Sequence, residues 1–215
     1  MRVVVVAVPG AGKTTTLQLL KKIMPEVRVV NFGDFMFEKA KATYGIKDRD
    51  EMRKKLSLEE YRKLQEEAAK EISELPGDVV IDTHVAIKMA TGYYPGLPSR
   101  VVKVLRPDVI VVMEFDPQLI VERRLKDVGL KKPVVTEVGT IRQPRSRRDI
   151  ESPEEIELHQ QMNRYFAVAA AHEVEACVKV LDFRKIPQTR PFEHAEIGAK
   201  MLADLIKAHR NSRGG

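Results

Sequence analysis

Residues 7–15 read AVPGAGKTT, at the junction between the valine-rich run Arg2–Val8 and the helical pattern Lys13–Met24. A glycine-rich turn that links a strand to a helix is the context in which phosphate-binding loops occur. Its small residues let backbone N–H groups turn toward an oxyanion, and the helix N-terminus adds its dipole. The stretch therefore predicts a site for a nucleoside triphosphate. That site comprises Val8, Pro9, Gly10, Ala11, Gly12, Lys13, Thr14, Thr15 and Thr16.

Two residues of this loop have predicted chemical roles. Lys13 can reach the β- and γ-phosphates, and the Thr14 hydroxyl can bind Mg²⁺. The complete pattern starts with glycine where this chain has Ala7, and alanine is compatible if that residue does not need a positive φ. The loop alone does not choose between a kinase, a GTPase and an ATPase. The chain has no Asn-Lys-x-Asp motif, which the familiar GTPases use to read guanine.

The hydrophobic pattern around the loop predicts an α/β fold. Short valine-rich runs with little alternation indicate strands that are covered on both faces, as in a parallel sheet. These runs are Arg2–Val8, Val27–Phe32, Asp78–Asp82, Val109–Phe115 and Val178–Phe183. Helical patterns alternate with them, at Lys13–Met24, Asp34–Tyr44, Leu58–Leu75, Pro117–Val128, Glu154–Ala176 and Phe192–Arg210. Ser57, with Glu60 three residues later, predicts a capping box.

Composition excludes several classes of protein. The chain has 215 residues, 43% of them hydrophobic, which suits one packed domain rather than a disordered chain. A single cysteine, Cys177, excludes a disulfide framework and a Cys-based zinc site, and we expect it in the core. No apolar run approaches the roughly 20 residues of a membrane span. The apolar start MRVVVVAV is cut off too early for a signal peptide, so we expect a cytoplasmic protein.

The charge balance points to an anionic ligand. There are 37 Lys and Arg against 31 Asp and Glu, a net charge of +6. Four arginines gather in the long, non-periodic stretch 126–152, which is where a closing lid would lie. They are Arg142, Arg145, Arg147 and Arg148. Aromatic residues do not interleave with these basic residues as they do in single-strand binders, so nucleic acid is an unlikely partner.

Asp82 ends the third predicted strand and is the candidate acid beside Mg²⁺, with contact through water; capping the next turn is its alternative role. Arg53 could bind an acceptor phosphate through two hydrogen bonds, or it could be a solvated arginine on a helix face. His84 is predicted to be a structural hydrogen-bonding residue, with a catalytic role as its alternative. Thr91–Ser99 is predicted to be a loop, and its part Gly92–Pro98 is expected to contribute to the acceptor pocket.

Longer stretches of the chain resemble the archaeal-type adenylate kinases. They are PGAGKTT, NFGDFMFEKA, IDTHVAIKMATGYYPGLPS, DPQLIVERRL and RQPRSRRDIES, and they lie within residues 1–183. The resemblance implies a P-loop kinase fold in which the five predicted strands form one parallel sheet. It implies a single domain over 1–215, with an AMP-binding helical region at about 33–75 and a lid at about 126–152. The implied reaction is MgATP + AMP ⇌ MgADP + ADP, in a homo-oligomer such as a trimer.

The resemblance also assigns residues. It places AMP binding at Gly33, Asp34, Arg53 and Lys88, although many relatives would have arginine in place of Lys88. Catalysis falls to Lys13 with the lid arginines Arg142, Arg145 and Arg147. Arg124 is a further candidate for a lid arginine, and Asp149 lies beside them in the sequence. Leu125–Ile141 is longer than the expected lid, and its VVTEV segment indicates a β-hairpin or an oligomer contact.

Three other functions fit the same phosphate loop. A kinase for another nucleoside monophosphate would differ only in its acceptor pocket. An RNA-associated module that uses ATP as a switch would show slow hydrolysis and salt-sensitive RNA binding. A structural α/β domain that merely binds ATP would transfer no phosphoryl group.

Overall fold

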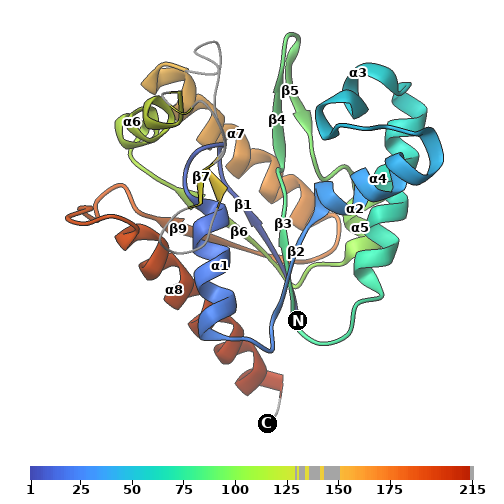
Figure 1. Ribbon diagram of the computed structural model, residues 1–215. Helices are drawn as coiled ribbons and strands as arrows, with labels where there is room; N and C mark the ends of the chain where they lie inside the picture. Colours follow the sequence, from blue (N-terminus) through green and yellow to red (C-terminus); the bar gives the residue numbers. More distant parts are fainter. Residues whose placement is uncertain (129, 131–133, 136–140, 143–150, 214–215) are drawn as a thin grey trace.

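A five-stranded parallel sheet forms the centre of the molecule (Figure 1). The computed structural model describes residues 1–128, 130, 134–135, 141–142 and 151–213. The strand order is β2-β3-β1-β6-β9, which confirms the predicted parallel α/β architecture. The strands are β1 (Arg2–Val6), β2 (Arg28–Asn31), β3 (Val79–Asp82), β6 (Val109–Glu114) and β9 (Cys177–Asp182).

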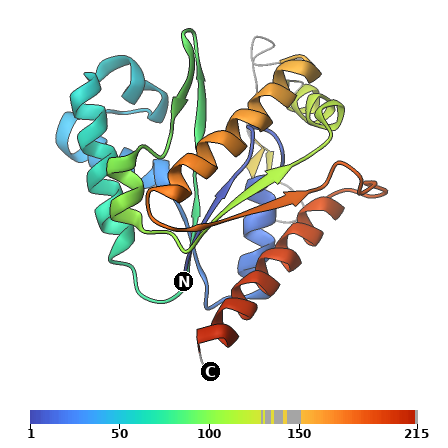
Figure 2. The ribbon, with the colours of Figure 1, turned by 180° about the vertical axis from the view of Figure 1, so that it is seen from behind.

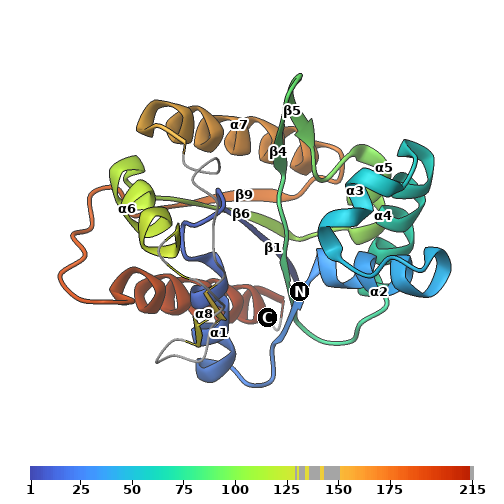
Figure 3. The same ribbon diagram turned by 45° about the horizontal axis from the view of Figure 1, so that its top comes forward.

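Helices cover both faces of the sheet, as Figures 2 and 3 show. Val3 and Val5 of β1 face one hydrophobic core, whereas Val4 and Val6 face the core on the opposite side of the sheet. This alternation follows from the two-residue period of a strand. On the first face lie α1 (Lys13–Ile23) and α8 (Glu193–Arg213), and on the second lie α2 (Phe32–Tyr44), α4 (Leu58–Ser73), α5 (Ser99–Leu105) and α7 (Pro153–His172).

The remaining predicted helix, α6, spans Pro117–Val128 as expected. The predicted capping box is also confirmed, because the Ser57 side chain accepts from the Glu60 N–H and Glu60 accepts from the Ser57 N–H. Ser152 and Glu155 form a second capping box at the start of α7. Local sequence signals therefore fix where these helices begin.

The edge strands correct two expectations. β2 and β9 are not covered on both faces. In β2, Arg28 is exposed and the next three residues are half-buried, and in β9 exposed residues alternate with half-buried or buried ones. Cys177, expected in the core, is exposed at the start of β9. An edge strand has a neighbour on one side only, and its valine content does not reveal this position.

The segment Thr91–Ser99, predicted as a loop after β3, instead contributes the second strand of a two-stranded hairpin. Its strands are β4 (Ala86–Met89) and β5 (Gly92–Pro95), and it projects beyond the sheet in Figure 1. The region 33–75 also contains a short 3-10 turn, η1 (Arg49–Glu51), and α3 (Met52–Lys55). In the long stretch before α7, β7 (Val134–Val135) pairs antiparallel with β8 (Ile141–Arg142), which agrees with the hairpin interpretation. Within the described residues, no helix combines the length and apolar character required to cross a membrane.

Candidate active site

The phosphate loop connects β1, the central strand, to α1. Gly10 and Gly12 have φ values of 85° and 100°, a region that glycine occupies without strain. Ala7 is not among the residues of positive φ in the described part of the chain, so alanine is compatible with this loop. Gly12 is the N-cap of α1 and has no side chain, unlike the serine caps of α4 and α7. The free N–H groups of this turn and the helix dipole can therefore bind an anion.

Lys13 lies at the carboxyl edge of the sheet beside Asp82. Its Nζ is 2.5 Å from Asp82 Oδ1 and donates to the Thr83 carbonyl oxygen. The register of β1 and β3 places Asp82 opposite Val5, just before the loop. Burial lowers the pKa of Lys13, the Asp82 carboxylate opposes this shift, and the charge of Arg49 adds to it. The sheet therefore brings Lys13, the cation of the phosphate loop, next to Asp82, the acid predicted to lie beside Mg²⁺.

A second polar cluster continues from Asp82 toward β2. Asn31 donates from Nδ2 to Asp82 Oδ2 at 3.1 Å, and its Oδ1 caps α2 by accepting from the Asp34 N–H. Arg49 donates to Asn31 Oδ1 at 2.9 Å and to Asp34 Oδ1 at 2.8 Å. A Cβ on Gly33 would lie 1.7 Å from Arg49 Nη2, so a larger residue there would require the Arg49 guanidinium to move. The structure thus brings Gly33, Asp34 and Arg49 together.

Two arginines of α6 contact the carbonyl oxygens of the phosphate loop. Arg123 donates to the Ala11 oxygen, and Arg124 donates to the Pro9 oxygen at 2.9 Å. Arg124 is 1% exposed and also donates to Glu151 Oε2 at 2.7 Å. These arginines therefore hold the backbone of the loop through its carbonyl oxygens.

Lys88, on β4, lies in an ionic cluster at the start of α7. Its Nζ is 2.8 Å from Glu151 Oε1 and 2.9 Å from Glu155 Oε1. Hydrogen bonds from these two carboxylates raise the pKa of Lys88. Since Glu151 also binds Arg124, the hairpin is connected to the phosphate loop through four residues: Lys88, Glu151, Arg124 and Pro9.

Comparison with known proteins decides the family. A family model described as an AAA domain matches residues 6–142. An adenylate kinase from Pyrobaculum aerophilum is 53% identical over 206 residues, which make up 96% of this chain and 96% of that protein. The chain belongs to the adenylate kinase family. It is therefore a phosphotransferase, as the resemblance implied.

Further adenylate kinases agree. The adenylate kinase of Pyrococcus furiosus is 40% identical over 183 residues, which cover 84% of this chain and 85% of that protein. The adenylate kinase of Thermoplasma acidophilum is 38% identical over 181 residues, covering 84% and 88%.

Solved kinases share the fold at low identity. A shikimate kinase from Acinetobacter baumannii has a TM-score of 0.55 at 14% identity and covers 97% of this chain and 93% of its own. A shikimate kinase from Bacteroides thetaiotaomicron has a TM-score of 0.53 at 17% identity, covering 96% and 98%. These likenesses show the P-loop kinase fold.

In this member of the adenylate kinase family, the four residues predicted to bind AMP are not shown to lie together in one place. Gly33 and Asp34 lie together, whereas Lys88 is held by Glu151 and Glu155. Arg53 is on α3, and its side chain lies outside the described residues. Arg145, Arg147 and the side chain of Arg142 also lie outside them.

Arg49 is the residue that sequence reasoning missed. It precedes Arg53 in the segment DRDEMR, and both arginines follow the same helical pattern. The only local signal was Gly33, because a glycine at the start of a helix can mark a close approach by another group. Arg123 was missed as well, since nothing in its helix indicates contact with a loop 112 residues away in sequence.

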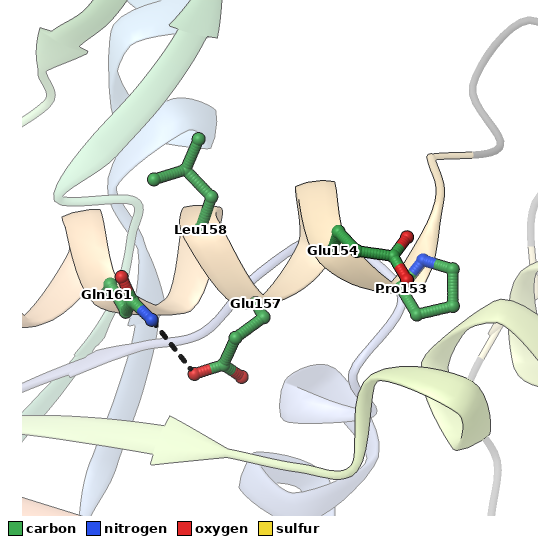
Figure 4. A pocket seen from close by; sticks show the side chains of 5 residues that line it. All are labelled: Pro153, Glu154, Glu157, Leu158 and Gln161. Atoms are coloured by element: carbon green, nitrogen blue, oxygen red, sulfur yellow. Dashed lines mark hydrogen bonds between the residues drawn. The ribbon is translucent and has the colours of Figure 1, made fainter.

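The hollow drawn in Figure 4 is not a nucleotide site. It lies on α7 and is lined by Pro153, Glu154, Glu157, Leu158 and Gln161. Glu157 accepts from Gln161 Nε2 at 3.4 Å. Two carboxylates in this position would repel phosphate groups.

Proposed function

We propose that the protein catalyses the reversible transfer of the γ-phosphoryl group from ATP to AMP. The observation that carries this proposal is the continuous polar row from Lys13 through Asp82 and Asn31 to Arg49. It places one cation at the phosphate loop and a second cation over Gly33, along the same edge of the sheet. Two phosphate groups held by these cations would face each other across Asp82. The names of the related proteins support the choice of adenylate as acceptor.

Phosphoryl transfer needs positioning and neutralisation of charge more than covalent help from the protein. The loop N–H groups and Lys13 would bind the ATP phosphates, and Arg49 would orient the acceptor phosphate through its planar pair of donors. Arg123 and Arg124 keep the loop in place through its carbonyl oxygens. The lid arginines Arg142, Arg145 and Arg147 remain proposed partners of the transferring group.

The donor set fits Mg²⁺. Thr14 lies in the first turn of α1 and Asp82 is the last residue of β3, and hard cations of this kind take oxygen ligands such as their hydroxyl and carboxylate groups. Among the described residues, His, Cys, Asp and Glu form no group of three that could hold a metal. The ion would therefore arrive with the nucleotide, as Mg²⁺ often does, bound by few protein groups. When bound, it neutralises charge on the phosphate oxygens.

The direct test is product analysis. The protein is incubated with MgATP alone and then with AMP, CMP, UMP or GMP, and diphosphates are measured by chromatography. Rapid ADP formation with AMP alone supports the proposal. Faster transfer to another monophosphate would change the acceptor. Slow hydrolysis that ignores every acceptor would refute the proposal and favour an ATP-dependent binding module.

We expect Arg49→Ala to raise the KM for AMP about tenfold or more, because a hydrogen bond to a charged group contributes roughly 1.5–3 kcal/mol. The KM for ATP should change little. Steady-state kinetics with each substrate varied in turn provides the measurement. Arg62→Ala, at an exposed position of α4, is the matched control. Arg53→Ala, tested in parallel, would overturn the Arg49 assignment if it alone raised the KM for AMP.

Assembly and location extend this proposal. Leu158, Tyr165 and Val168 are 49%, 64% and 57% exposed on α7, and the seven-residue step from Leu158 to Tyr165 suits helix pairing between copies of the chain. We therefore propose a homo-oligomer, with a trimer as the form the resemblance implies. Light scattering during gel filtration should give a multiple of the 24.4 kDa chain mass, and a monomer would refute this. Location in the cytoplasm remains a proposal.

A further inference from the structure

His194, on α8, is a buried polar residue outside the phosphate row. It is 2% exposed, and its ring lies 5.7 Å from that of Phe115 and 5.5 Å from that of Phe183. The two phenylalanine rings stack at 4.7 Å. Buried polar groups are costly without hydrogen bonds, so the partners of this imidazole indicate its role.

The partners of His194 define its tautomer. Nδ1 is 3.2 Å from Arg123 Nη2, and Nε2 is 2.7 Å from the Ile186 carbonyl oxygen. Arginine only donates and a carbonyl oxygen only accepts. Nδ1 must therefore accept from Arg123 while Nε2–H donates to Ile186. The neutral imidazole satisfies both contacts at once, and the imidazolium ion cannot.

Arg123 extends this contact to the phosphate loop. Its guanidinium donates to the Ala11 carbonyl oxygen and to Gln188 Oε1, and it lies 5.1 Å from the centre of the Phe115 ring. A Cβ on Gly12 would be 3.5 Å from Arg123 Nη1, so the guanidinium lies directly against the loop. Burial lowers the pKa of Arg123 to about 10, so it remains charged at neutral pH. His194 thus connects the segment after β9 to the loop through one arginine.

We propose that neutral His194 is a positioning residue, which holds Arg123 against the phosphate loop and thereby maintains the affinity of the loop for ATP. The ATP part of this inference rests on the proposed function. His194 itself would touch neither the nucleotide nor the reacting atoms.

The inference predicts a dependence on pH. Protonation would turn Nδ1 into a donor facing the Arg123 donors and would place two positive charges together. The charged and titratable groups around His194 are Arg123 on α6 and the neighbouring Glu193. Burial lowers the pKa of His194 and Arg123 adds to this, while the Ile186 hydrogen bond and Glu193 oppose it. The contact is thus complete above the ordinary histidine pKa of about 6.5 and is lost as pH falls through the lower folded-state pKa of His194.

Two variants separate the two hydrogen bonds. His194→Asn puts an amide oxygen near the Nδ1 position and can keep the Arg123 contact, whereas His194→Gln puts its amide near the Nε2 position and keeps the Ile186 contact. Neither side chain titrates. The dissociation constant of ATP is measured by calorimetry between pH 5 and 8, together with the KM values for ATP and AMP and the melting temperature. His172→Gln, at an exposed position of α7, is the control.

For the wild type we expect ATP binding to weaken as pH falls through the folded-state pKa of His194, which lies below the ordinary value of about 6.5, with the KM for AMP nearly constant. His194→Gln should weaken ATP binding about tenfold at pH 7.5, the loss of one hydrogen bond to a charged group. His194→Asn should stay close to the wild type at that pH and lose the acid weakening.

Wild-type affinity for ATP in His194→Gln, or an acid weakening that survives in both variants, would overturn the inference. A lower melting temperature with unchanged ATP affinity in both variants would show a purely structural role and overturn it too. If the wild type binds ATP with this pH dependence but transfers nothing to AMP, the proposed function fails and the role of His194 stands.

Discussion

Replacing Lys13 with alanine should lower turnover about a hundredfold or more, the usual cost of removing one group that stabilises transition-state charge. Lys13 is 8% exposed and its ammonium group is fixed by Asp82 and Thr83 at the edge of the sheet. A cation fixed in this way is already oriented when charge develops on the transferring group. The lost stabilisation therefore appears in kcat as well as in the KM for ATP.

The measurement is initial-rate kinetics with saturating AMP, paired with a melting curve. Lys21→Ala is the control, because Lys21 is an exposed lysine in the last turn of the same helix. Lys13→Met keeps the length of the side chain and tests whether charge or packing matters. Near-normal kinetics in both Lys13 variants would contradict the assignment of residues 8–16 as the nucleotide site.

Replacing Arg124 with methionine should lower the free energy of unfolding by roughly 3 kcal/mol, the lower end of the range for breaking a buried ion pair. Arg124 is 1% exposed, and its loss leaves the Glu151 carboxylate without one partner and the Pro9 carbonyl oxygen without a donor. We take the lower end because the Glu151 side chain is 16% exposed and keeps Lys88. The KM for ATP should rise as well, since Pro9 belongs to the phosphate loop.

Urea unfolding of both proteins at pH 7 measures this effect. Arg190→Met is the control, because Arg190 forms an exposed ion pair with Glu196 and its loss should leave the unfolding midpoint unchanged. Equal midpoints for the wild type and Arg124→Met would show that the pair does not support the loop.

The pH dependence of the same experiment has a definite sign. Burial raises the pKa of Glu151, but hydrogen bonds from Lys88 and Arg124 outweigh it, so this pKa lies below its ordinary value. The stability from this pair is complete above the ordinary glutamate pKa of about 4.3 and is lost as pH falls through the lower folded-state value. The difference between the wild type and Arg124→Met should therefore shrink in acid.

Much of the fold could be predicted from the sequence. The phosphate loop, the five strands of the parallel sheet and the capping box at Ser57 each depend on residues that are close together in the chain. A valine run, a glycine turn and a serine-to-glutamate spacing each carry their own physical reason, whatever the rest of the chain does. The positions of Gly33, Asp34, Lys13 and Asp82 at one sheet edge follow in turn, because parallel strands end at the same edge.

The tertiary structure decided which charged side chains meet there. Arg49 lies over Gly33; Lys88 pairs with Glu151, 63 residues away; and Arg123 contacts Ala11 across 112 residues. Long cationic side chains look alike in sequence, since their partners are set by strand register and helix packing. The sequence by itself determined that a phosphate site exists and where its loop lies. Only the packing of distant elements determined which arginines and which histidine hold that loop in place.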